Sequence, residues 1–117
     1  NPQAIERATS IWGFDQELVI PRLGFATVGD YYAATSPLYF LADIDKPVLI
    51  IYAADDPMFD PTLVEELHDL AHTRSNLDLL LTPSGGHVGY ISNKTCQKLN
   101  FDRDPWWSWN RVLEWLE

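Results

Sequence analysis

The chain has 117 residues, which suits a single domain, and 46% of them are hydrophobic, so the composition excludes a typical disordered protein. Eight basic and seventeen acidic residues give a formal net charge of −9 at pH 7, which argues against nucleic acids and anionic membranes as partners. The only cysteine, Cys96, excludes an internal disulfide and a cysteine-based zinc cluster.

The first part of the chain, residues 1–46, is expected to be helical or irregular. Apolar residues are spaced as on a short helix over residues 2–12. Asn1 could cap this helix, with Pro2 in the first helical position. Residues 13–29 hold three glycines and one proline, and the sequence predicts an irregular segment there.

A second helix is predicted between two boundary signals. Asp30 is a typical capping residue, and the run that follows it continues to Thr35. Ser36-Pro37 should stop the helix, because the residue before a proline disfavours the helical conformation. Residues 38–41 could form one further turn.

The second part, residues 47–117, is predicted to be a strand–helix–strand–helix unit. An apolar, β-branched run over residues 48–52 is too short for a typical helix and indicates a buried strand. Asp60-Pro61 should open an amphipathic helix, and a second strand is predicted over residues 77–82. This order favours a parallel pair of strands with a right-handed crossover.

The C-terminal residues are predicted to be a loop followed by one helix. Residues 91–104 show no regular pattern and are expected to be a loop. Pro105 should begin the final helix. Its apolar residues form one stripe that is typical of packing on a sheet, namely Trp106, Trp109, Val112, Leu113 and Leu116.

Two acidic residues and a histidine follow the two predicted strands. Asp55 and Asp56 come after the first strand, and His87 lies in a glycine-rich loop after the second. In open α/β sheets, functional groups collect at the carboxyl ends of the strands. An acid and then a histidine at two such ends match the second and third members of a Ser-Asp-His triad. Turn, capping and structural roles for the same residues remain the alternative.

Some histidines, aspartates and tryptophans of the chain could instead form a metal site or a stacking surface. His68 and His72 are four residues apart and could in principle bind a metal on one helix face, but two solvent-facing helix residues are the preferred explanation. Asp55, Asp56 and His87 could instead hold a divalent cation, but this set falls short of a typical closed site. The tryptophans at 106, 107 and 109 could stack a sugar or base, yet their helical spacing favours core packing.

Several motifs, taken in order, resemble the C-terminal part of the YheT-like branch of the α/β-hydrolases. The most specific are Ala53-Ala54-Asp55-Asp56-Pro57 and Gly85-Gly86-His87-Val88-Gly89-Tyr90, and the resemblance covers nearly the whole chain. It implies an α/β fold in which residues 1–117 form the C-terminal portion of one hydrolase domain. It also implies two or so parallel strands with flanking helices. By position in the motifs, Asp56 should be the triad acid and His87 the general base, with Asp55 the less favoured acid.

The resemblance implies a serine hydrolase that acts on carboxylic esters, which could be lipid esters, without a cofactor. The chain contains no G-x-S-x-G motif, so the nucleophile and the oxyanion hole should lie outside it. The chain alone is therefore expected to be inactive. A non-catalytic α/β interaction module that retains the hydrolase scaffold is the alternative function.

The expected partners follow from the same interpretation. They are an ester substrate and the missing N-terminal part of the same protein, with a second copy of the chain able to pair along an exposed sheet edge. A reducing, cytoplasmic location is expected from the single cysteine. No transmembrane segment is expected, because no apolar run reaches about 18 residues.

Overall fold

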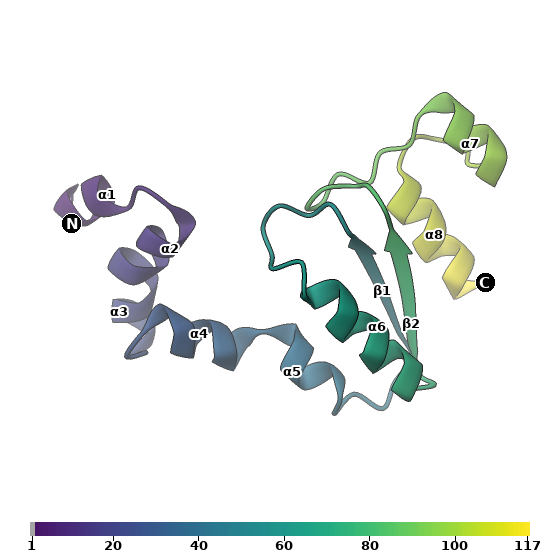
Figure 1. Ribbon diagram of the computed structural model, residues 1–117. Helices are drawn as coiled ribbons and strands as arrows, with labels where there is room; N and C mark the ends of the chain where they lie inside the picture. The colour runs from purple at the N-terminus through teal and green to yellow at the C-terminus, as the bar shows by residue number, and fades with distance from the viewer. Residues whose placement is uncertain (1) are drawn as a thin grey trace. The chain divides into compact units, whose positions relative to one another are not determined.

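The computed structural model describes residues 2–117, and these divide into two compact units with the boundary between Asp43 and Ile44. Helices are the only regular elements of the first unit within the described residues (Figure 1). Its elements are α1 (Pro2–Arg7), α2 (Ile11–Phe14), a π-helical segment η1 (Asp15–Val19), α3 (Ile20–Leu23), α4 (Val28–Thr35) and α5 (Pro37–Leu41). The expected cap at Asn1 lies outside the described residues.

The prediction of an irregular segment at 13–29 is wrong for residues 13–23, which are helical, and the helix expected over 2–12 is divided in two. The first helix ends at Arg7, and Ser10 caps a new one by accepting a 2.9 Å hydrogen bond from the Gly13 amide. Helical turns then run on to Leu23 through the π-helical segment. Pro21 has no N–H to offer the preceding turn, which favours the wider hydrogen-bonding pattern just before it.

The helix predicted to be capped by Asp30 is present but begins three residues earlier. Thr27 is its N-cap, and its side-chain oxygen accepts a 3.0 Å hydrogen bond from the Asp30 amide. Asp30 lies in the first turn, where its carboxylate accepts a 2.8 Å bond from the Thr27 hydroxyl. The Thr27 side chain therefore caps the helix, and the Asp30 carboxylate holds the Thr27 hydroxyl in place without being the cap itself. The helix ends at Thr35, as the following Ser36-Pro37 predicts.

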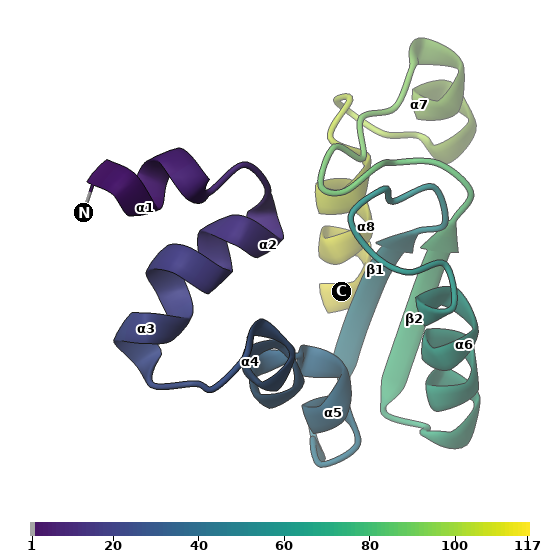
Figure 2. The ribbon, with the colours of Figure 1, turned by 60° about the vertical axis from the view of Figure 1, so that its left-hand side comes forward.

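The second unit contains a two-stranded parallel sheet between two helices. Strands β1 (Val48–Ala53) and β2 (Leu77–Thr82) pair in register from Val48 with Leu77 to Ala53 with Thr82. Helix α6 (Leu63–Thr73) connects them, and α8 (Trp107–Leu116) follows later in the chain. Figure 2 shows these two helices on opposite faces of the sheet. The predicted strand–helix–strand arrangement is confirmed.

Apolar packing and a few polar contacts hold this unit together. Leu67 on α6 and Leu77 on β2 are both buried, as the amphipathic pattern of the helix requires. At the start of the sheet, the Asn76 amide donates to the backbone oxygens of Ile44 and Lys46, both at 2.9 Å. These bonds tie the beginning of β1 to the turn before β2. The two strands therefore end together at the opposite edge of the sheet.

The region between β2 and α8 differs from its prediction. Residues 91–104 are not all loop, because α7 (Lys94–Asn100) lies there with Asn93 as its N-cap. Helix α7 has no apolar periodicity, so no pattern revealed it. The final helix begins at Trp107 and not at Pro105, since Trp106 bridges to Ile91 in an antiparallel contact.

The stripe predicted on the final helix does not pack on the sheet as expected. Four of its five members are exposed, namely Trp106, Trp109, Leu113 and Leu116. Trp107 and Trp115 are partly buried, and the Trp115 indole N–H donates to a carboxylate oxygen of Asp78 on β2 at 2.7 Å. None of the helices in residues 2–117 is long and apolar enough to cross a membrane.

Candidate active site

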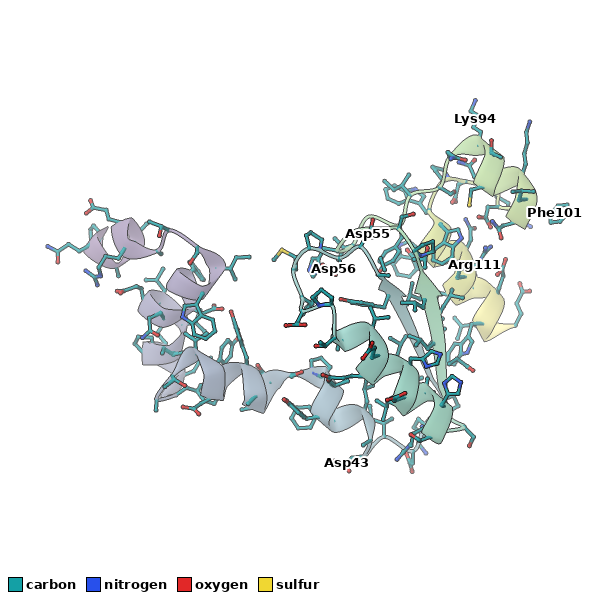
Figure 3. All side chains as sticks on the ribbon, viewed as in Figure 1. Asp43, Asp55, Asp56, Lys94, Phe101 and Arg111 are labelled. Carbon is teal, nitrogen blue, oxygen red and sulfur yellow. The ribbon has the colours of Figure 1, made fainter. Side chains whose placement is uncertain are left out.

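Two loops meet beyond the carboxyl ends of β1 and β2. Ala53 and Thr82 are the last paired residues, so the loops that follow them start side by side. Asp55 and Asp56 lie in the first loop, above the end of β1 (Figure 3), and His87 lies in the second. The sheet thus brings His87 close to two neighbouring aspartates that lie about thirty positions earlier in the chain. They meet at the edge where parallel α/β sheets carry their functional groups.

Asp56 and His87 are in direct contact. The imidazole Nδ1 of His87 lies 3.0 Å from Oδ2 of Asp56, within hydrogen-bonding distance. The Asp56 side chain is 2% exposed, whereas the His87 side chain is 46% exposed. The predicted contact between the two residues is therefore present. A buried carboxylate beneath a half-exposed imidazole leaves the other ring nitrogen, Nε2, free to meet a reacting group.

The surroundings keep Asp56 ionised. Burial alone would raise the pKa of its carboxyl, but two hydrogen bonds outweigh burial and lower the pKa below its ordinary value. The Met58 amide donates to Oδ1 at 2.8 Å, and His87 contacts the other oxygen. Both carboxylate oxygens are thus occupied. An ionised acid in this position fixes the imidazole tautomer with a proton on Nδ1 and stabilises the imidazolium.

Asp55 faces a different part of the histidine loop. Its Oδ1 accepts hydrogen bonds from the backbone amides of Gly85 and Gly86, both at 2.9 Å. Among the described residues, His87 receives its only carboxylate contact from Asp56. The two consecutive aspartates therefore have separate partners. Sequence reasoning did not find this division, because two neighbouring acids look alike until the path in space of the loop that both bind is known.

Two aromatic residues that the sequence analysis left without a role complete the site. The ring of Phe59 lies 5.7 Å from that of His87, measured between centroids, and its side chain is exposed. Tyr90 stacks on Trp107 at 6.3 Å and donates its hydroxyl to the backbone oxygen of Ile51 at 3.3 Å. Burial, more than the nearby carboxylates, raises the pKa of Tyr90. The available signal was their position in the sequence, because Tyr90 is the last residue of the histidine motif and Phe59 lies two residues beyond the aspartate motif.

The metal arrangements considered from the sequence gain no support. The rings of His68 and His72 lie 4.1 Å apart, but Nδ1 of His72 contacts the backbone oxygen of His68 at 2.9 Å. Across residues 2–117, no three side chains of the metal-binding types come together in a way that could hold an ion. Of the three neighbouring tryptophans, Trp107 packs on Tyr90, while the other two are exposed.

Comparison with known proteins assigns the chain to a family. A sequence model of the α/β hydrolase fold matches residues 27–94, which include β1, α6, β2 and the two loops of the site. The chain belongs to the α/β hydrolase family. The resemblance found in its motifs is thereby confirmed, as is the fold class. No solved structure matches the chain significantly.

Several curated proteins are similar to this chain. A putative esterase of Synechocystis, slr0264, is 56% identical over 98% of the chain, which covers 31% of that protein. The putative esterase YheT of Escherichia coli is 33% identical over 86% of the chain, covering 27% of that protein. The phospholipase ABHD3 of Mus musculus is 34% identical over 74% of the chain, covering 21% of that protein. The chain thus spans a third or less of the length of these relatives, which are esterases or lipases by name.

Proposed function

We propose that the full-length protein is a serine hydrolase of carboxylic esters, in which Asp56 is the triad acid and His87 the general base. The observation that carries this proposal is the 3.0 Å contact between His87 Nδ1 and a buried Asp56 carboxylate at the ends of two parallel strands. Membership of the α/β hydrolase family and the similarity to named esterases support it. Residues 1–117 are the part of one hydrolase domain that supplies the acid and the base.

In the proposed reaction, a serine from the rest of the protein attacks the ester carbonyl, and His87 Nε2 takes the proton from its hydroxyl. The tetrahedral intermediate collapses, and the same proton leaves with the alcohol, so an acyl-serine remains. Water then attacks the acyl group after giving a proton to His87, and serine recovers that proton as the acid departs. Asp56 stays ionised throughout and stabilises each imidazolium.

The ester substrate is proposed to carry an apolar group, as a lipid ester does. Three apolar side chains are exposed around the catalytic pair, and they are Met58, Phe59 and Val88. Phe59 is close enough to His87 for an apolar substrate group lying on it to reach the reacting atoms. The phospholipase ABHD3 among the similar proteins supports this substrate class.

The proposed partner of this chain is the remainder of the same protein. Each strand of the two-stranded sheet has one unpaired edge, and the apolar stripe of α8 is exposed. Strands and side chains from the remainder would pair with the sheet and cover the stripe. A second copy of the chain pairing along the same edge is the alternative. A cytoplasmic location is proposed because Cys96 is a free thiol.

Hydrolysis of p-nitrophenyl esters by the full-length protein tests the proposed function. His87→Ala should lower kcat/KM by at least about a thousandfold, because the nucleophile loses its base. His72→Ala is the matched control, since His72 lies on α6 and its ring contacts the backbone oxygen and the ring of His68 on the same helix. Its activity should equal that of the wild type.

Two outcomes would contradict the proposal. Activity that survives His87→Ala would show that another group acts as the base. A wild-type protein that folds but hydrolyses no ester of any acyl length would support the alternative, a non-catalytic interaction module.

A further inference from the structure

We propose that Asp55 is a positioning residue that holds the histidine loop, residues 83–90, on the end of β1 so that His87 meets Asp56. The inference rests on the proposed function, because it assigns Asp55 a task in the same reaction. Asp55 does not touch the reacting atoms in this account. It acts through the backbone of the loop that carries the base.

The contacts of the two aspartates support separate tasks. Asp56 uses its carboxylate on the His87 side chain and the Met58 amide. Asp55 uses one oxygen, Oδ1, to accept both the Gly85 and the Gly86 amides at 2.9 Å. These amides come directly before His87 in the chain. One side chain therefore fixes the backbone from which the imidazole projects, and its neighbour fixes the imidazole itself.

The loop needs such an anchor because its own sequence does not make it rigid. Gly86 has φ +60°, which L side chains rarely adopt, and a glycine at this position leaves the unfolded loop with many conformations. His87 is half-exposed and makes one side-chain hydrogen bond among the described residues, to Asp56. The position of the ring therefore depends on the backbone beneath it. Within the loop, the Tyr90 amide donates a 3.2 Å hydrogen bond to the Gly85 oxygen, which links the residues on either side of His87.

The role needs a hydrogen-bond acceptor at position 55 and not a charge. Asparagine keeps a side-chain oxygen that can accept both amides, whereas alanine leaves them without a protein partner. At position 56 the requirement differs, because an asparagine there offers a donor to one of two groups that both need an acceptor. Substitution by asparagine should therefore leave activity nearly unchanged at position 55 and lower it strongly at position 56.

The test combines hydrogen exchange and kinetics on the full-length protein with Asp55→Ala and Asp55→Asn. Exchange is followed by mass spectrometry on peptides that cover residues 83–90. Asp60→Ala is the matched control, since Asp60 is close in the chain and its carboxylate oxygen Oδ1 accepts from Thr62, at 3.0 Å from the amide and 2.8 Å from the hydroxyl.

Asp55→Ala should speed exchange in the loop about tenfold. It should also lower kcat roughly tenfold to a hundredfold at unchanged KM, as expected when a catalytic group is misplaced by about 1 Å. Asp55→Asn should restore both quantities, and Asp60→Ala should change neither. Loop exchange and kcat at wild-type values in Asp55→Ala would overturn the inference, as would an Asp55→Asn variant that is as impaired as Asp55→Ala. If the wild type hydrolyses no ester, the proposed function fails, and the exchange data alone then decide whether Asp55 holds the loop.

Discussion

Replacing Asp56 with asparagine separates the charge of the triad acid from its shape. In the wild-type structure, Oδ1 accepts the Met58 amide at 2.8 Å and Oδ2 faces His87 Nδ1 at 3.0 Å. Asparagine has one oxygen, and the Met58 amide can only donate, so that oxygen must stay on the Met58 side. The NH₂ group then faces His87 and forces Nδ1 to accept. The imidazole proton moves to Nε2, which can no longer take a proton from serine.

The expected loss is about 10⁴-fold in kcat, the size found when the same change gives the wrong tautomer in other triads. The assay is ester hydrolysis by the full-length protein, with circular dichroism to show that the fold is intact. Nitrogen-15 NMR of the histidine ring should report a proton on Nδ1 in the wild type and on Nε2 in Asp56→Asn. A variant that keeps more than about a tenth of wild-type activity, or that keeps the wild-type tautomer, would refute this reasoning.

Three further predictions concern stability and the shape of the loop. Because the pKa of Asp56 is lowered in the folded state, its contribution to stability is present above the ordinary value of 3.8 and is lost as pH falls through the lower, folded-state pKa. Urea midpoints measured between pH 7 and pH 2 should therefore fall further in the wild type than in Asp56→Asn, and equal decreases would contradict the assignment. Arg111→Met should lower the free energy of unfolding by about 3–5 kcal/mol, because the Asp102 carboxylate, which is 1% exposed, loses its ion-pair partner. Adding Asp102→Leu to the same chain should recover much of this loss in urea unfolding. Gly85→Ala should cost about 1–3 kcal/mol and lower kcat, since the new Cβ would lie 2.7 Å from a Tyr90 ring carbon; thermal melts that match the wild type would count against this packing.

The parts of the fold that carry strong patterns could be predicted from the sequence. Strands at 48–52 and 77–82 and the helix between them follow from apolar periodicity and from Pro61, and the structure departs from their bounds by only a few residues. The contact of Asp56 with His87 could be expected because parallel strands place their carboxyl ends together.

Other features depend on contacts that no local pattern records. Helix α7 is polar, and its start is set by the Asn93 side chain, so periodicity missed it. The helical turns of residues 11–23 run through a glycine and a proline because a π-helical segment accommodates Pro21. Asp55 and Asp56 bind different parts of one loop, the Gly85 and Gly86 amides and the His87 ring, and this division depends on the path of that loop in space.

The most direct test of the triad is covalent labelling of the full-length protein with a fluorophosphonate, which reacts with activated serines. The proposed function predicts that the wild type is labelled at one serine outside residues 1–117, and that His87→Ala and Asp56→Asn abolish or strongly slow labelling. Mass spectrometry of the labelled peptide locates the site. Labelling of one of the six serines of this chain, at 10, 36, 75, 84, 92 or 108, or labelling that is unaffected by His87→Ala, would contradict the central claim.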